Sequence, residues 1–206
     1  MNTIAAALDN ELAPVAVARP RSSTQHETDE TLLKRVGQGD RRAMQILYTR
    51  HSVRTFRSLM RLIHDEALAE DLTSDVFTKV WQDADRFEGR SQVSTWILAI
   101  ARFMAISTLR RRRDDALDDT HVETVVDPSD DPEVCLQNQD RLTILRRCLG
   151  HLSRDHREII DLAYYHEKSI KEIAGIVGVP CNTVKTRMFY ARQRMSELLQ
   201  QAGVDR

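Results

Sequence analysis

The stretch that decides the fold is residues 169–187, which read SIKEIAGIVGVPCNTVKTR. Ser169 followed three residues later by Glu172 is the capping-box signature of a helix start. Ala174 is small where a second helix must cross closely, and Gly178 can adopt the positive φ that ends the first helix. A Val-Pro pair then makes the turn into a second helix. This order of residues predicts a helix-turn-helix.

The second helix of this motif, which we expect to open at Cys181 or Asn182, keeps its positive charge off the packing face. Four basic residues and no acidic one lie between Lys185 and Arg194. Side chains near the start of such a helix reach base edges in the major groove, and arginine forks match phosphate geometry. A hairpin used only for protein contact is the alternative. We predict DNA binding, with these candidate residues: Lys185, Thr186, Arg187, Phe189, Tyr190 and Arg192.

The charge of the chain is unevenly distributed. Its 206 residues carry a formal net charge of −1, but Arg110–Arg113 form a run of four, and residues 114–133 hold nine acidic residues and no Lys or Arg. Two positive patches separated by a negative segment suggest phosphate contact at both patches, although solvated helix faces would show the same pattern.

Composition excludes several classes of protein. With seven Gly and five Pro, a mostly helical architecture is favoured over an all-β one. The longest apolar run, Trp96–Ala101, is far shorter than the ~20 residues of a membrane-spanning helix. No signal peptide is expected, and three scattered cysteines fit a reducing cytoplasm. No phosphate loop or nucleophile motif is visible, so we expect no enzyme, no cofactor and no bound metal.

Helical periodicity divides the chain into four parts. Residues 1–28 have no sustained period and are predicted to be a flexible tail. Residues 29–113 form one helical module, with a loop at 87–91 and a last helix capped by Ser94 or Thr95. Residues 114–133 have no apolar face and are predicted to be a flexible acidic linker. Residues 134–201 form the second module. The expected fold class is therefore all-α, with two small helical domains.

Two segments of the first module carry a family resemblance: DLTSDVFTKVW at 71–81 and FEGRSQVSTWILAIAR at 87–102, followed by the arginine run. Together with LSRDHREII at 152–160 and the helix-turn-helix, they resemble regions two and four of an extracytoplasmic-function (ECF) sigma factor of the sigma-70 family. The resemblance covers roughly residues 29–201, in family order.

That resemblance implies a sigma factor that binds core RNA polymerase, directs it to promoters and promotes melting, in a stress or environmental response. Asp71, Asp75 and Phe77 would contact the β′ clamp helices, although Phe77 is equally suited to the core. The second module would bind the minus-thirty-five element and the β flap. An anti-sigma factor is an expected partner, and membrane insertion is not. The minus-ten element would be held by these residues: Arg86, Arg90, Ser91, Arg102, Phe103, Arg110, Arg111, Arg112 and Arg113.

Some positions depart from the family pattern. Many members have Asn in place of Phe103 and Asp in place of Ser107, and an apolar-Gln pair is common where Thr73-Ser74 stand. Tyr190 replaces a frequently basic residue. These departures concern promoter preference, because Phe103 can stack on a base where an amide would hydrogen-bond to it.

Two other functions remain open from the sequence. A stand-alone helix-turn-helix regulator would bind duplex DNA without polymerase, and a sigma mimic would titrate an anti-sigma factor without reading promoters. A metal site is a third, weaker alternative, because Cys148 and His151 are spaced for one helix face and two further histidines follow, but no second cysteine pair stands at zinc spacing.

Overall fold

The computed structural model describes residues 27–115 and 136–203, and in this part of the chain every regular element is helical. The elements are α1 (Asp29–Gly37), α2 (Arg41–Ile63), α3 (Glu66–Asp83), the short 3₁₀ helix η2 (Ala84–Arg86), α4 (Val93–Asp115), α5 (Leu136–Gly150), α6 (Arg154–Tyr164), α7 (Ile170–Val177) and α8 (Cys181–Gln201). The all-α prediction is confirmed. Most of the acidic linker and of the N-terminal tail lies outside the described residues.

Side-chain caps set most of the helix starts. The Asp40 carboxylate accepts hydrogen bonds from the backbone N–H groups of Arg42 and Ala43, and that of Asp65 accepts one from Leu68. These bonds satisfy donors that would otherwise have no partner at a helix start. The bond from Leu68 and the Arg112 guanidinium also lower the pKa of Asp65.

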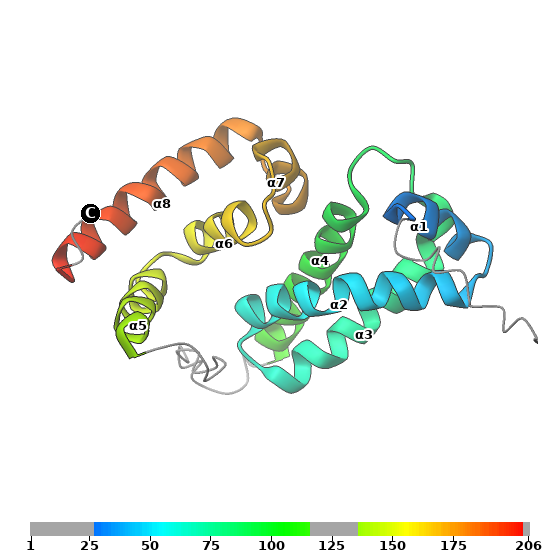
Figure 1. The fold of residues 1–206 in the computed structure, drawn as a ribbon, viewed down its shortest axis with the longest axis horizontal. Helices are drawn as coiled ribbons and strands as arrows, with labels where there is room; N and C mark the ends of the chain where they lie inside the picture. The colour runs from blue at the N-terminus through cyan, green and yellow to red at the C-terminus, as the bar shows by residue number, and fades with distance from the viewer. Residues whose placement is uncertain (1–26, 116–135, 204–206) are drawn as a thin grey trace, which may run out of the picture.

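The first helical group consists of α1–α4 (Figure 1). It encloses a core of aliphatic side chains. Leu32, Leu47, Leu59, Val76 and Val80 are among its fully buried members. Helices α2, α3 and α4 pack on one another, as the helical periods of their sequences predict.

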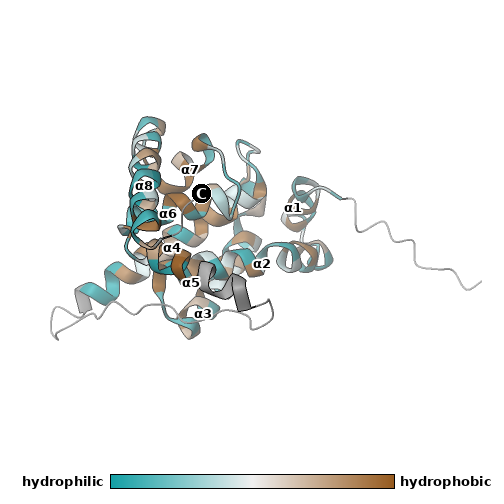
Figure 2. Ribbon diagram, turned by 60° about the vertical axis from the view of Figure 1, so that its left-hand side comes forward, coloured by the Kyte–Doolittle hydropathy of each residue, from teal (hydrophilic) through white to brown (hydrophobic). Residues whose placement is uncertain are grey.

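The second group, α5–α8, has a separate cluster built around Ile159, Ile173 and Val184. In Figure 2 the brown, apolar faces of α6 and α7 lie toward the interior. Leu98 belongs to this second cluster although it stands on α4, and α4 packs directly on α7. The two groups therefore share a packed contact, which the sequence did not indicate.

Helix α4 begins slightly earlier than expected. Its first residue is Val93, and the carbonyl of Gln92 accepts the hydrogen bond of the Trp96 N–H, so the predicted cap at Ser94 or Thr95 is wrong. Both candidate caps instead contact the second helical group. The stretch 93–113 is also long and apolar enough to cross a membrane by composition, but Val93, Ile97 and Ala101 fill the core of the first group. We assign it as a core helix.

Candidate nucleic-acid interface

The helix-turn-helix forms as the sequence predicts. Ser169 and Glu172 make a reciprocal capping box at the start of α7, and Gly178 ends this helix with φ 74°. The turn leads into α8, which starts at Cys181. Val184, Met188 and Ala191 are buried against the rest of the group, so the opposite face of α8 is left for other contacts.

The exposed face of α8 carries the predicted duplex-binding residues. Lys185 and Thr186 are exposed, and the Thr186 hydroxyl donates to the carbonyl of Asn182 at 3.0 Å. Phe189 and Tyr190 are largely exposed and meet edge to face, with ring centroids 5.5 Å apart. Exposed aromatic and basic side chains on one helix suit a nucleic-acid surface.

Two of the predicted residues on α8 already have partners within the second group. Arg187 Nη2 lies 2.7 Å from Asp155 of α6, and its side chain is only 28% exposed. The Arg192 guanidinium lies over the ring of Tyr164, 5.7 Å from its centroid. DNA contact by Arg187 therefore requires exchange of a carboxylate for a phosphate.

The predicted single-strand surface combines Arg86 at the end of η2, the loop that follows it and one side of α4. The loop is held to α4 by Phe87, whose ring centroid lies 5.3 Å from that of Trp96. Arg86 and Arg90 are exposed, and each has an acidic neighbour in its own segment: Asp83 for Arg86 and Glu88 for Arg90.

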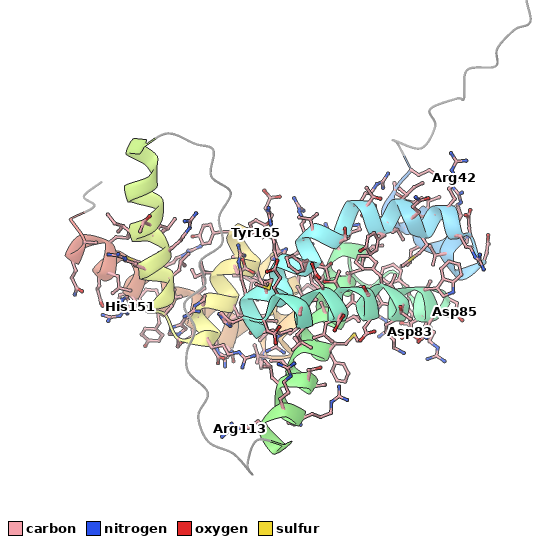
Figure 3. All side chains as sticks on the ribbon, turned by 90° about the horizontal axis from the view of Figure 1, so that it is seen from below. Arg42, Asp83, Asp85, Arg113, His151 and Tyr165 are labelled. Atoms are coloured by element: carbon pink, nitrogen blue, oxygen red, sulfur yellow. The ribbon has the colours of Figure 1, made fainter. Side chains whose placement is uncertain are left out.

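The arginine side chains at the C-terminal end of α4 are open to solvent. Arg110–Arg113 are all exposed, and Arg112 pairs with Asp65 at 3.1 Å. Arg113 lies near the free end of the helix in Figure 3. Ser91 is half-buried, and its hydroxyl donates to the carbonyl of Gln92 at 3.4 Å.

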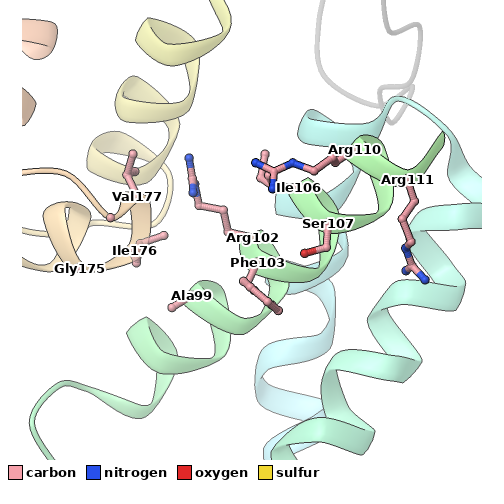
Figure 4. Close-up of a pocket in the computed structure, with 11 residues that line it drawn as sticks. Ala99, Arg102, Phe103, Ile106, Ser107, Arg110, Arg111, Gly175, Ile176 and Val177 are labelled. Carbon is pink, nitrogen blue, oxygen red and sulfur yellow. The ribbon is translucent and has the colours of Figure 1, made fainter. Parts of the chain in front are cut away.

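A groove of about 630 Å³ runs between α4 and α7 (Figure 4). Phe103, 73% exposed, lines it together with Arg102, Arg110 and Arg111 from the predicted minus-ten set. Ile176 and Val177 of α7 form the facing wall. The structure thus brings four of the nine residues of the predicted strand-binding set to one groove. The other five lie outside its lining: Arg86, Arg90, Ser91, Arg112 and Arg113.

Polar contacts between the two helical groups involve residues that sequence reasoning missed. Arg102 on α4 donates to both carboxylate oxygens of Glu158 on α6, at 2.6 and 3.3 Å. Lys168 Nζ donates to Ser94 Oγ at 2.6 Å and to the Gln92 side-chain oxygen at 3.2 Å. No signal in the sequence identifies these partners, because they lie 56 to 76 positions apart.

At the contact between the two helical groups, hydrogen bonds favour the ionised form of Glu172. Burial opposes ionisation of Glu172, but hydrogen bonds from the Thr95 hydroxyl, at 2.6 Å, and from Ser169 outweigh it and lower the pKa of Glu172 to about 2. Burial lowers the pKa of Lys168, which nevertheless donates to Ser94 beside the Glu172 carboxylate.

The three residues predicted to contact polymerase differ in their exposure to solvent. Asp71 and Asp75 are exposed on α3, whereas Phe77 is only 3% exposed and packs edge to face on Tyr48, 4.8 Å between centroids. Phe77 therefore serves the core and offers no surface to a partner. Among the residues that the structure describes, no group of three or more metal-ligating side chains could hold an ion.

Comparison with known proteins identifies both helical groups. Residues 47–114 match the family model "Sigma-70 region 2", and residues 142–195 match "Sigma-70, region 4". The ECF RNA polymerase sigma factor SigL of Mycobacterium tuberculosis is 31% identical over 169 residues, which is 79% of this chain and 92% of that protein. The RNA polymerase sigma-H factor of Pseudomonas aeruginosa is 27% identical over 183 residues, covering 84% and 95%.

A solved structure shows the same arrangement of elements. The sigma factor RpoE of Bartonella quintana, crystallised with the anti-sigma factor NepR, superposes with a TM-score of 0.65 at 29% identity, covering 79% of this chain and 98% of RpoE. An all-helical body with region-two and region-four units defines the class as sigma-70-type initiation factors. Within that class, the chain belongs to the ECF RNA polymerase sigma factors, and it is not itself an enzyme.

Proposed function

We propose that this sigma factor binds core RNA polymerase, places it at a set of promoters and holds the melted strand during initiation, with residues 29–113 acting as region two and residues 134–201 as region four. Two features of the same chain support this most directly. One is the groove that four basic or aromatic residues of α4 line, and the other is the exposed basic recognition helix α8.

Region two is proposed to act on the minus-ten element. Melting takes bases out of the stack at a cost of a few kcal/mol per step, and a protein without ATP chemistry offsets this cost only by binding the separated strand better than the duplex. Exposed Phe103 supplies a face for a base, and Arg102 with the Arg110–Arg113 run supplies phosphate contacts. Arg86, Arg90 and Ser91 would hold the strand beside the loop.

Region four is proposed to grip intact duplex at the minus-thirty-five element. Lys185, Thr186 and Arg187 stand in the first two turns of α8, where side chains reach base edges. The aromatic pair and Arg192 follow along the same helix and would contact the backbone.

The proposed polymerase contacts are the β′ clamp helices for Asp71 and Asp75 on α3, and the β flap for region four. Both carboxylates are exposed, as a contact with a basic partner requires. An anti-sigma factor is the proposed regulator, because RpoE of Bartonella quintana, which resembles this chain, is seen with one. By the same likeness, we place the protein in the cytoplasm.

The test is to mix the purified chain with core polymerase and a panel of promoter fragments, and to map unpaired thymines with permanganate. Opening that needs both proteins supports the proposal. Duplex binding without polymerase would indicate a stand-alone regulator, and neither activity would indicate a mimic. Arg187→Ala should weaken binding to one upstream element and so reduce discrimination among upstream sequences, with Glu197→Gln, at the exposed end of α8, as the control.

A further inference from the structure

Beside the groove, α4 packs against the second helical group of the same chain. Arg102, assigned above to the melted strand, directs its guanidinium to Glu158, with Nε at 2.6 Å from one carboxylate oxygen and Nη2 at 3.3 Å from the other. A two-point contact of this kind matches the geometry with which arginine holds a phosphate. The Glu158 carboxylate therefore occupies the donors that Arg102 would offer to a phosphate.

Helix α6 acts in the same way on the other DNA-binding surface. Asp155, three residues before Glu158, lies 2.7 Å from Arg187 of the recognition helix. One helix thus neutralises an arginine from each of the two surfaces that are proposed to hold promoter DNA.

Further contacts hold the two groups together along the length of the interface. At the start of α4, Thr95 donates to Glu172 at 2.6 Å. Near the other end, the Tyr165 hydroxyl accepts from Arg57 Nη1 at 2.6 Å, and the Arg61 guanidinium lies over the Tyr165 ring, 4.5 Å from its centroid. Figure 3 shows Tyr165 where α6 meets the first helical group.

In this arrangement the two proposed DNA-binding surfaces lie too close together to reach both promoter elements at once. Elements centred about 25 base pairs apart are separated by about 85 Å at 3.4 Å per base pair. Gly178 lines the groove beside α4, and α8 begins three residues later, at most about 11 Å further along the chain. Since the 21 residues of α8 span only about 31 Å, the whole recognition helix lies within about 45 Å of the groove.

We infer that this side of α4 is a docking surface for α6 and α7 of the same chain, and that the structure is a closed, autoinhibited form in which region four engages Arg102 of the strand-binding surface, while Phe103 and Arg110–Arg113 stay exposed. Glu158 is the residue that competes with the promoter strand for Arg102. The inference rests on the proposed function, because it concerns regulation of the same surface.

The test uses the full chain and the variant Glu158→Gln, which leaves Arg102 without its ion pair. Glu197→Gln is the matched control: it removes a carboxylate that also pairs with an arginine, Arg194 at 3.0 Å, but within α8. Tyr165→Phe is a second opening variant, since it removes only the hydroxyl that accepts from Arg57. Circular dichroism verifies that each variant is folded.

Two measurements are made on each variant. Small-angle scattering should show a larger radius of gyration for Glu158→Gln and Tyr165→Phe than for wild type and Glu197→Gln. A fluorescent oligo-dT of about 20 nucleotides should bind about tenfold tighter to Glu158→Gln than to Glu197→Gln, as expected when a charged hydrogen bond that favours the closed form is lost.

Equal radii and equal oligo-dT affinities in Glu158→Gln and Glu197→Gln would overturn the inference. Failure of this inference can be distinguished from failure of the proposed function. If the chain opens no promoter with polymerase, the function fails while scattering still reports the closed form. If promoters open but Glu158→Gln changes neither measurement, only the inference fails.

Discussion

At the scale of single residues, His166 is a buried group whose protonation is strongly disfavoured in the folded chain. Its side chain is almost fully enclosed, with Nε2 at 3.4 Å from Asp161, and Asp161 also pairs with Arg61. Burial, followed by the positive charges of Arg61, Arg54 and Lys168, lowers the pKa of His166 from 6.5 to about 4. The imidazole is therefore neutral in the folded chain at neutral pH.

This shift predicts a pH dependence of stability. Between pH 6.5 and 4 the unfolded chain binds a proton at His166 that the folded chain does not, so the free energy of unfolding falls as the pH falls. The loss between pH 7 and 4.5 is about 2 kcal/mol for this residue. Urea denaturation across that range should show a smaller pH dependence in His166→Gln. Exposed His151→Gln is the control, and an equal pH dependence in both variants would contradict the assignment.

At the scale of elements, α7 and its end offer a matched pair of glycines. Gly178 has φ 74° and no atom within 4 Å of the place where an alanine methyl would stand, so Gly178→Ala adds backbone strain without a clash and should destabilise by about 1 kcal/mol. Gly175 is helical with equally open surroundings, so Gly175→Ala should stabilise by about 0.5–1 kcal/mol. Denaturant midpoints measure both changes. Shifts of the same sign would show that backbone conformation does not govern this turn.

The arginine run at the end of α4 predicts how promoter affinity depends on salt concentration. Replacing Arg110–Arg113 with Ala should lower the affinity of the polymerase-bound factor for promoter DNA with little change in sequence preference, because phosphate contacts carry no sequence information. Each lost contact to a single strand should reduce the slope of log affinity against log salt by about 0.7. Titrations at several salt concentrations measure that slope, and an unchanged slope would remove the run from the backbone contacts.

Local signals in the sequence were sufficient for the elements but not for their assembly. The capping box at Ser169, the Asp40 start and the glycine end at Gly178 lie within a few residues of what they specify, so they predicted helix limits well. Phe77 and Arg102 show what local signals cannot predict. The burial of Phe77 and the ion pair of Arg102 depend on residues that only the folded chain brings near, such as Glu158, which is 56 positions from Arg102.

At the scale of the whole molecule, Leu98 couples the two groups. It stands on α4 but is 5% exposed within the core of region four. Leu98→Ala should cost about 2–4 kcal/mol and release region four to unfold first. Both tryptophans, Trp81 and Trp96, are in region two, so their fluorescence reports that unit, whereas circular dichroism reports all helices.

The two signals should coincide in wild type and separate in Leu98→Ala, with the dichroism change at lower denaturant. Leu59→Ala, fully buried inside region two, is the control and should move the fluorescence transition itself. Coincident signals in Leu98→Ala would show that this side chain does not join the units.

The double use of Arg102 has a consequence for engineering. The guanidinium that pairs with Glu158 is also the one proposed to hold the promoter strand, so we expect no substitution there to change promoter affinity alone. A variant with altered affinity for the strand should also change how much transcription occurs in the absence of a stimulus. We therefore expect leakiness and promoter affinity to change together, and a regulator engineered at Arg102 to need a compensating change on α6.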